Sequence, residues 1–251
     1  SSGPKLLRAT RLFAREHELP FALHVAESQA ESELLRSGAG PLAPVAKQLA
    51  VGFEPPMSGP IAYLDRLGVL EGAVAVHCCQ ALPIDVPRLA ATVSGVVLCP
   101  RSNAYLHNGN PPAERLARAH VPLGIGTDSA ASNDDLDLLA EVRALGAVAP
   151  KLTAGQLLDI ATCGGAMVLG IDDQFGSLEP GHQGDLAIFR IPATDDPVAA
   201  VVGGAGRATL DAVLAAGTWR IRDAEPAFDI AKTERAAAAA TKRAEESLAS
   251  A

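Results

Sequence analysis

Aromatic residues are scarce in this chain, and dense runs of Lys and Arg are missing from it. Phe, Trp and Tyr make up 4% of the sequence while 48% is hydrophobic, so we expect a large core of aliphatic side chains. The formal net charge of -8 argues against a surface that coats nucleic acid. This composition fits an enzyme acting on a small molecule better than a nucleic-acid-binding protein.

Cysteines are also few, and their spacing excludes two kinds of site. Cys78 and Cys79 are adjacent, Cys99 and Cys163 stand among apolar or small residues, and no C-x-x-C occurs. This pattern fits neither a disulfide framework nor a cysteine-rich zinc site. We expect buried free thiols in a reducing compartment.

The chain has no signal peptide, long apolar span or lipidation signal, so we expect a cytoplasmic protein without a membrane partner. It begins Ser1-Ser2-Gly3-Pro4 without an initiator Met and passes directly into a helical pattern. Such a start is typical of a cut inside a longer protein.

Strand-like and helix-like segments alternate through the first two thirds of the chain, as in parallel βαβ units. The predicted strands are residues 21–25, 73–76, 95–98 and 122–127. The predicted helices are residues 6–17, 29–36, 45–49, 61–67, 85–92, 112–119 and 154–167, with one more beginning near Leu136. Residues 99–103 are expected to form a polar elbow after the third strand. Four strands are half of the eight that a closed (β/α)8 barrel needs.

The pattern changes toward the C-terminus. A tight turn at 176–181 precedes an alternating strand at 185–191, and β-like runs follow at 198–202, 212–216 and 218–222. We therefore expect a partial barrel over residues 1–174 and part of a small β-sandwich over 175–231. Residues 232–251 form an Ala-rich tail, either a terminal helix or a frayed one.

Ionisable residues stand where three of the predicted strands end. His24 ends the first strand and is followed by Glu27, His77 ends the second, and Asp128 ends the fourth. The carboxyl ends of parallel barrel strands form one active-site rim, where imidazole and carboxylate groups bind a divalent metal. A nearby glutamate suits proton transfer from the attacking water to the leaving group. The joint pattern favours a metal-assisted hydrolase.

Each of these residues also has a purely structural interpretation. Asp128 would cap the following helix or turn. Glu27 would be a first-turn acid that stabilises a helix dipole, and His24 would be a half-buried, hydrogen-bonded residue. His77 would be a buried histidine near two cysteines.

Five ordered motifs together resemble the amidohydrolase superfamily. They are HVAES (24–28), VHCCQ (76–80), CPRSN (99–103), GTDSAASN (126–133) and GSLEPGHQGDLAIF (176–189). They are most similar to its adenosine-type deaminase and chlorohydrolase branch. The resemblance implies an α/β fold, here the C-terminal half of a metal-dependent (β/α)8 TIM barrel with strands equivalent to 5–8, plus part of a β-sandwich.

The resemblance also implies roles for individual residues. His24 and Asp128 match the metal ligands of the fifth and eighth strands, and Glu27 matches the proton-shuttling glutamate. His77 matches the sixth-strand histidine that hydrogen-bonds the attacking water or the substrate. We expect Glu27, His77 and Asp128 to be catalytic, and Glu27, His77 and Ser129 to contact substrate. The cofactor is one divalent metal, usually zinc, although such ligands also suit iron, manganese or nickel.

One feature of the family is missing. No H-x-H pair, which supplies two further metal ligands from the family's first strand, occurs among the 251 residues. Two protein ligands against the usual three predict weak metal binding by the chain alone. We therefore expect a C-terminal part of an enzyme that pairs with a complementing N-terminal half or forms a homo-oligomer.

The implied reaction is hydrolytic removal of the 6-amino group of an adenine-type nucleoside. The segments GAGPLAPVAKQL (38–49) and SGPIAYL (58–64) are similar to aminodeoxyfutalosine deaminases of the futalosine route to menaquinone. Deaminases of S-adenosylhomocysteine or methylthioadenosine share most of the same motifs. The motifs are also compatible with a chlorohydrolase and with a non-catalytic half-barrel remnant.

Overall fold

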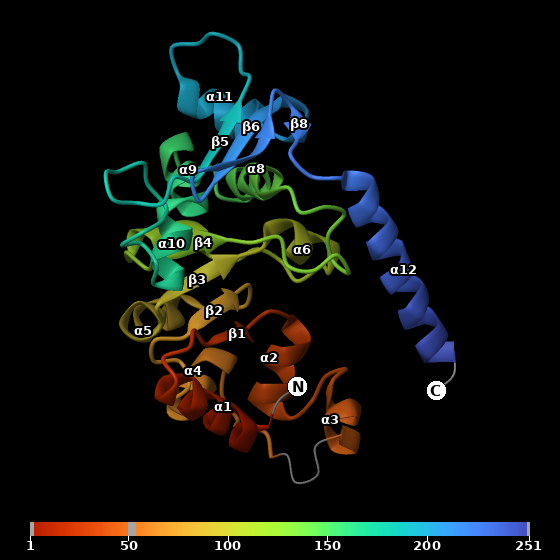
Figure 1. Cartoon of the computed structure of the whole chain (residues 1–251). Helices are drawn as coiled ribbons and strands as arrows, with labels where there is room; N and C mark the ends of the chain where they lie inside the picture. The colour runs from red at the N-terminus through yellow and green to blue at the C-terminus, as the bar shows by residue number, and fades with distance from the viewer. Residues whose placement is uncertain (1–2, 50–53, 250–251) are drawn as a thin grey trace.

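The computed structural model describes residues 3–49 and 54–249, and its centre is a parallel four-stranded sheet (Figure 1). The strands are β1 (Ala22–Val25), β2 (Val74–His77), β3 (Gly95–Leu98) and β4 (Leu123–Ile125), in that spatial order. The four parallel strands predicted from the sequence are confirmed. Because neighbours pair in parallel, the carboxyl ends of all four strands meet at one edge of the sheet.

Helices pack against this sheet and bury most of β2, β3 and β4. They are α1 (Pro4–Glu16), α2 (Gln29–Ser37), α3 (Ala43–Leu49), α4 (Pro60–Arg66), α5 (Val86–Thr92), α7 (Ala113–Arg118), α8 (Leu138–Val148), α9 (Ala154–Ala161) and α10 (Cys163–Leu169), with a 3-10 turn at Pro83–Asp85. Leu89 and Leu116 are fully buried between these helices and the strands, together with Val96 and Leu98. Phe21 is the only aromatic side chain in the buried core of the described residues, so the expected aliphatic core is confirmed.

Two helices stand where the sequence predicted something else. The elbow at 99–103 lies in α6 (Pro100–Tyr105), because Pro100 at the first helical position favours a helix start. The β-like run at 198–202 lies in α11 (Pro197–Gly204). There Asp196 accepts a hydrogen bond from the Ala199 amide and Pro197 again begins the helix, which outweighs the strand preference of the valines.

The predicted helix over 154–167 is broken into α9 and α10 at Thr162, whose φ of -122° and ψ of -94° are not helical. The break lets α10 lie directly on β4. Gly165 faces Gly124 of the strand so closely that a methyl group on Gly124 would lie 3.4 Å from the Gly165 Cα. Gly164 and Gly165 thus permit the close packing of α10 on β4.

A second, antiparallel sheet follows, formed by β5 (Leu186–Phe189), β6 (Leu210–Ala215), β7 (Thr218–Arg222) and β8 (Glu225–Pro226), with a 3-10 turn at Arg207–Thr209 before β6. Ala216 and Gly217 connect β6 to β7 with φ of 48° and 70°, the backbone that a tight two-residue hairpin requires. Figure 1 shows this sheet beyond α8 and α9, at one end of the molecule. Strands predicted at 185–191, 212–216 and 218–222 are confirmed.

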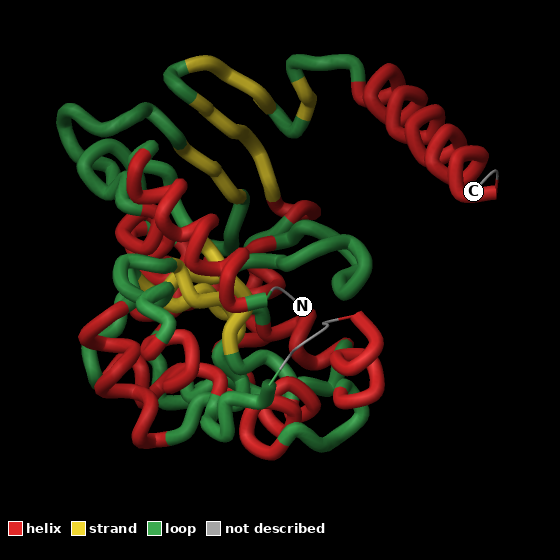
Figure 2. The backbone as a smooth tube through the Cα atoms, turned by 90° about the horizontal axis from the view of Figure 1, so that it is seen from below, coloured by secondary structure: helices red, strands yellow, loops and turns green. Residues whose placement is uncertain are grey.

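The last helix, α12 (Ile230–Ala249), extends away from the rest of the chain in both views (Figures 1 and 2). Its described side chains, up to Glu246, are all exposed. The expectation of a terminal helix is therefore confirmed as far as Ala249. Among residues 3–49 and 54–249, no helix combines the length and the apolar character needed to cross a bilayer.

Candidate metal and catalytic site

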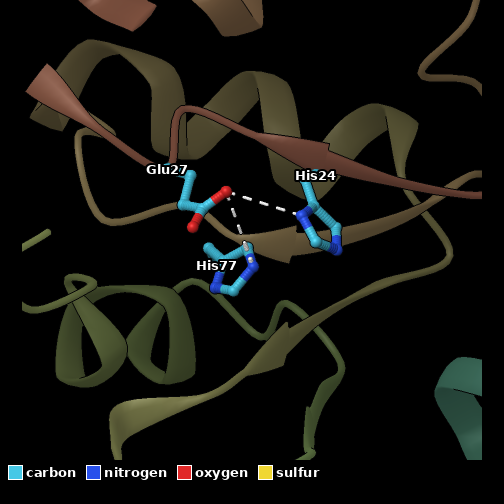
Figure 3. A group of neighbouring side chains, drawn as sticks. All are labelled: His24, Glu27 and His77. Atoms are coloured by element: carbon cyan, nitrogen blue, oxygen red, sulfur yellow. Dashed lines mark ion pairs between the residues drawn. The ribbon is translucent and has the colours of Figure 1, made fainter. Parts of the chain in front are cut away.

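Three potential metal-binding side chains converge at the carboxyl edge of the parallel sheet (Figure 3). His24 comes from β1, Glu27 from the segment after β1, and His77 from the end of β2. Glu27 Oε2 lies 3.5 Å from His24 Nδ1 and 3.8 Å from His77 Nε2. One donor atom from each residue lies within 4.8 Å of the other two, so all three can reach a single ion.

Strand pairing explains why the two histidines meet. Val25 is the register partner of His77, which places His24 and His77 on adjacent strands one residue apart. Their rings lie edge to face with centroids 4.5 Å apart. The His77 side chain is fully buried, whereas that of His24 is 58% exposed because β1 is an edge strand. The site is therefore open on the β1 side.

Glu27 is held with one carboxylate oxygen free to face the histidines. Asn108 Nδ2 donates to its Oε1 over 2.9 Å, while Oε2 faces His24 and His77. Glu27 precedes α2, whose N-cap is Ser28 and whose first-turn acid is Glu31. The interpretation of Glu27 as a first-turn helix acid is therefore wrong.

Glu31 takes that structural role and fixes the turn that carries Glu27. Its carboxylate accepts hydrogen bonds from the amides of Ala26, over 3.2 Å, and Glu27, over 2.8 Å. Burial raises the pKa of Glu31 above its ordinary value, and these hydrogen bonds oppose the rise. A partly buried acid thus orients the backbone at Glu27 itself.

One ring nitrogen of His77 has a hydrogen-bond partner, and the other has none among the described residues. Its Nδ1 lies 2.9 Å from Asn103 Oδ1. Its Nε2 is buried and has no hydrogen-bond partner within the described part of the chain. The nearest carboxylate oxygens lie at 3.8 Å on Glu27 and 4.0 Å on Asp128. A buried polar atom with no partner is unusual in a folded protein and marks a place for a ligand, ion or water.

Asp128 reaches this group from β4, although β3 separates β4 from β2. Its Oδ2 accepts hydrogen bonds from Ser102 Oγ, over 2.6 Å, and Ser132 Oγ, over 3.1 Å. Burial alone would raise the pKa of Asp128, but these hydrogen bonds lower it below the ordinary value. The carboxylate is therefore ionised at neutral pH.

The capping interpretation of Asp128 does not hold for the following helix. That helix, α8, begins only at Leu138, and its N-cap is Asp137, which accepts a hydrogen bond from the Ala140 amide. Asp128 lies near His77 of the three-residue group, with its Oδ2 4.0 Å from His77 Nε2. A role for Asp128 as a metal ligand together with His24 stays a prediction. Ser129 is exposed and its Oγ accepts from the Ala131 amide, so substrate contact by Ser129 also stays a prediction.

Several residues that brace the site were not identified from the sequence. Glu141 is fully buried and accepts hydrogen bonds from the Arg101 amide, over 3.0 Å, and from Asn133 Nδ2, over 2.6 Å. Asn133 Nδ2 also donates to the Thr127 carbonyl over 2.7 Å, which fixes the backbone next to Asp128. Asn103, Ser102 and Asn133 belong to the CPRSN and GTDSAASN motifs, but nothing in the sequence pairs them with their partners.

The cysteines near the site take no part in this chemistry. Cys78, Cys79 and Cys99 are buried and free, as expected, and Cys163 is free and partly buried. Burial raises the pKa of Cys79 and of Cys99 to about 12. Both thiols are therefore protonated at neutral pH and are poor metal ligands.

Hollows of different size lie at opposite ends of the parallel strands. The larger, about 250 Å³, includes Leu123 and Gly164 and lies at the amino end of β4, opposite the site. The smaller, about 200 Å³, is lined by Tyr105 and by Ser132, which donates to Asp128. The second hollow is thus the one in contact with the candidate site.

The residues present fit a divalent metal. Imidazole nitrogen and carboxylate oxygen are the donors that zinc takes in catalytic sites. His24, Glu27 and His77 supply such atoms within 4.8 Å of one another, and the unpartnered Nε2 of His77 is one of them. The same donor set also suits other divalent metals, so it does not fix the identity of the ion.

Comparison with known proteins agrees with this geometry. Residues 1–220 match the Amidohydrolase family. A 5-methylthioadenosine/S-adenosylhomocysteine deaminase of Desulforudis audaxviator is 33% identical over 228 residues, covering 85% of this chain and 49% of that protein. An aminodeoxyfutalosine deaminase of Deinococcus radiodurans is 36% identical over 176 residues, covering 66% of this chain and 42% of that protein.

The crystal structure of an adenosine deaminase from Xanthomonas campestris with bound zinc superimposes with a TM-score of 0.82 at 32% identity. The match covers 97% of this chain and 55% of that structure. This chain therefore spans about half the length of the relatives that it matches. With the family match extending over most of its length, the chain belongs to the amidohydrolase family.

Proposed function

We propose that this chain carries part of the active site of a metal-dependent aminohydrolase. The reaction replaces the 6-amino group of an adenine-type nucleoside by oxygen and releases ammonia. The observation that carries the proposal is the convergence of His24, Glu27 and His77 at one edge of a parallel sheet, with Asp128 at 4.0 Å from His77. The names of the relatives support the same reaction class.

We further propose that β1 to β4 correspond to strands 5–8 of a (β/α)8 barrel over residues 1–174. Residues 175–231 would then be part of a composite β-sandwich. The outer edges of β1 and β4 are unpaired among the described strands. A complementing N-terminal half, or a second copy of the chain, would cover these edges, because unpaired strand edges promote association.

In the proposed site, His24 and Asp128 would hold one divalent metal, with zinc the leading candidate. Such a metal makes water a better nucleophile at neutral pH. Glu27 Oε2, the carboxylate oxygen that no side-chain donor occupies, takes a proton from the attacking water. His77 Nε2 and Asp128 hold the attacking oxygen against the ring carbon.

As the water oxygen forms a bond to C6 of the purine, the C6–N1 double bond becomes single and Glu27 delivers the proton that it took to N1. The remaining hydroxyl proton passes to the amino nitrogen as C6 becomes a carbonyl, the bond from C6 to that nitrogen breaks, and ammonia leaves. The smaller hollow beside Asp128 is the proposed position of part of the nucleoside.

Two substrate classes are proposed. The resemblance of residues 38–49 and 58–64 favours aminodeoxyfutalosine, which would place the enzyme in menaquinone synthesis. The names of several relatives favour S-adenosylhomocysteine and methylthioadenosine. Ammonia release from each nucleoside by the complete zinc-loaded protein separates these candidates by their kcat/KM values. Release of chloride from a chlorotriazine without nucleoside turnover would contradict the deaminase assignment.

Glu27→Gln tests the proposed role of Glu27. Glutamine keeps the size of the side chain and cannot take a proton, so we expect kcat to fall about 10²- to 10⁴-fold while zinc content is unchanged. Glu16→Gln, at the exposed end of α1, is the matched control and should leave kcat unchanged. Loss of zinc from the Glu27→Gln protein would instead make Glu27 a metal ligand.

Nucleoside turnover by Glu27→Gln at the wild-type rate would contradict the proposed chemistry. Absence of turnover by the complete wild-type protein on every nucleoside and on the chlorotriazine would favour a non-catalytic remnant of the fold.

A further inference from the structure

Asn103, which has no role in the proposed reaction, forms a fully buried pair with His77. Asn103 Oδ1 lies 2.9 Å from His77 Nδ1, and both side chains are inaccessible to solvent. An amide oxygen can only accept a hydrogen bond, so a bond at this distance requires a proton on Nδ1. In a neutral imidazole, the other nitrogen then carries the lone pair.

We infer that Asn103 is a positioning residue that holds neutral His77 as the Nδ1–H tautomer, so that unprotonated Nε2 is the atom offered to the site. This nitrogen is the one that lies 3.8 Å from Glu27 and 4.0 Å from Asp128. Its catalytic use rests on the proposed function. The tautomer itself does not, because it is a property of this buried pair alone.

The two orientations of the Asn103 amide differ in what they leave at His77. Asn103 Nδ2 has no hydrogen-bond partner among the described residues, so either orientation leaves one buried amide atom unpaired. If the amide were reversed, Asn103 Nδ2 would donate to His77 Nδ1 and the ring proton would move to Nε2. That proton would be buried, with its nearest acceptors at 3.8 and 4.0 Å, beyond hydrogen-bond distance. Unprotonated Nε2 is instead free to bind a metal ion or to accept a hydrogen bond from water or substrate.

The position of Asn103 in α6 explains why its side chain is held in place beside His77. Its own amide donates to the Cys99 carbonyl over 2.9 Å, which holds it in the first turn of the helix. The preceding residue, Ser102, donates to Asp128 over 2.6 Å. One short helix turn thus orients two of the proposed catalytic residues, His77 from β2 and Asp128 from β4.

Nitrogen NMR of the ¹⁵N-histidine-labelled chain tests the inference without substrate or metal. The unprotonated ring nitrogen resonates far downfield, and its couplings to the two ring carbon protons identify it as Nδ1 or Nε2. The His77 signals among the six histidines are assigned by their loss in His77→Gln. We expect the downfield nitrogen of His77 to be Nε2, with the Nδ1–H tautomer favoured about tenfold, as one buried hydrogen bond provides.

Variants at Asn103 separate an effect of its acceptor oxygen on the His77 tautomer from a general change in packing. Asn103→Asp keeps an acceptor oxygen and should keep the Nδ1–H tautomer. Asn103→Leu has similar volume but no acceptor, and we expect it to lose the tenfold preference. Asn110→Leu, an exposed change in the neighbouring loop, is the control and should leave the wild-type spectrum.

The inference is overturned if wild-type His77 carries its proton on Nε2, or if Asn103→Leu retains the wild-type tautomer. If Asn103→Leu does not fold, the wild-type and Asn103→Asp spectra still test the inference. Absence of the Nδ1–H tautomer from either spectrum would contradict the role of Asn103. A wild-type Nδ1–H signal in a protein that turns over no nucleoside would overturn the proposed function and leave the tautomer assignment standing.

Discussion

Residues at the ends of the parallel strands have backbone angles that are unfavourable for side chains other than glycine. The φ angles are 49° for Ala26, 73° for His77, 53° for Cys78 and 59° for Asp128. Each costs about 1 to 3 kcal/mol and persists only where the surrounding contacts enforce it. These four residues lie beside the proposed metal site, and backbone strain at such positions is consistent with a functional role of these turns.

The hydrogen bonds to Asp128 give a prediction on pH-dependent stability. Because they hold its pKa below the ordinary value, the ionised carboxylate stabilises the fold above that value, and this contribution is lost as pH falls through the lowered pKa. The double variant Ser102→Ala/Ser132→Ala should lower the free energy of unfolding by about 1 to 3 kcal/mol at neutral pH. Urea unfolding without metal measures this difference.

Urea unfolding of the same two proteins at lower pH tests whether the effect depends on the charge of Asp128. We expect the difference between wild type and the double variant to shrink below about pH 4, where protonation of Asp128 weakens the bonds in the wild type. Ser129→Ala, at an exposed position, is the control and should follow the wild type at every pH. A difference that is independent of pH would show that the serines act only through packing.

His24, Glu27, His77 and Asp128 could be identified from the sequence because each lies at or shortly after the end of an apolar strand. The residues that orient them could not be identified in this way. Asn103 is 26 positions from His77 and Asn108 is 81 positions from Glu27, so the folded chain alone creates these pairs. Local spacing reveals which side chains reach the strand ends, but not which polar groups will hold them there.

Among the elements, two helices that begin with proline, α6 and α11, were not predicted as helices. The valines of α11 favour a strand by intrinsic preference, and the short polar run in α6 has no helical periodicity. In both cases a proline at the helix start, and for α11 a capping Asp196, decided the structure. Strands and helices with a clear apolar pattern, such as β2 and α5, were predicted closely.

The contact between α10 and β4 predicts the effect of one small substitution. A Cβ on Gly164 would overlap the backbone carbonyl oxygen of Leu123, which cannot move without disturbing β4. Gly164→Ala should therefore lower the free energy of unfolding by about 1 to 3 kcal/mol. Thermal or urea denaturation measures the loss.

Gly155→Ala is the matched control for that substitution. Gly155 is exposed in the neighbouring helix α9, and its added methyl group would meet only Thr153 Oγ1, at 3.8 Å. Alanine favours helix over glycine, so this variant should be neutral or more stable by up to about 1 kcal/mol. Equal destabilisation by both variants would contradict the close packing of α10 on β4.

For the whole molecule, α12 stands apart from the two sheets. Its described side chains are exposed throughout, so it adds little buried surface to the fold. Deleting residues 230–251 should shift the midpoint of thermal unfolding by less than about 2 °C. A much larger shift would show that α12 packs on the body of the protein in solution.

The family and the α/β architecture could be predicted from the sequence, because they depend on ordered motifs and alternating apolar runs. The partners of the open sheet edges could not, since β1 and β4 carry no local signal of what pairs with them. The chain spans about half the length of its relatives, so the proposed barrel would need further strands to close.

Zinc titration of the ¹⁵N-histidine-labelled chain, followed by NMR, tests the proposed metal site most directly. We expect the ring signals of His24 and His77 to change together and before those of the exposed His17, His107 and His120. The change should also be lost from His77 in the variant His24→Ala. If zinc perturbs the exposed histidines first, or leaves His24 and His77 unchanged even in large excess, the proposed metal site is contradicted.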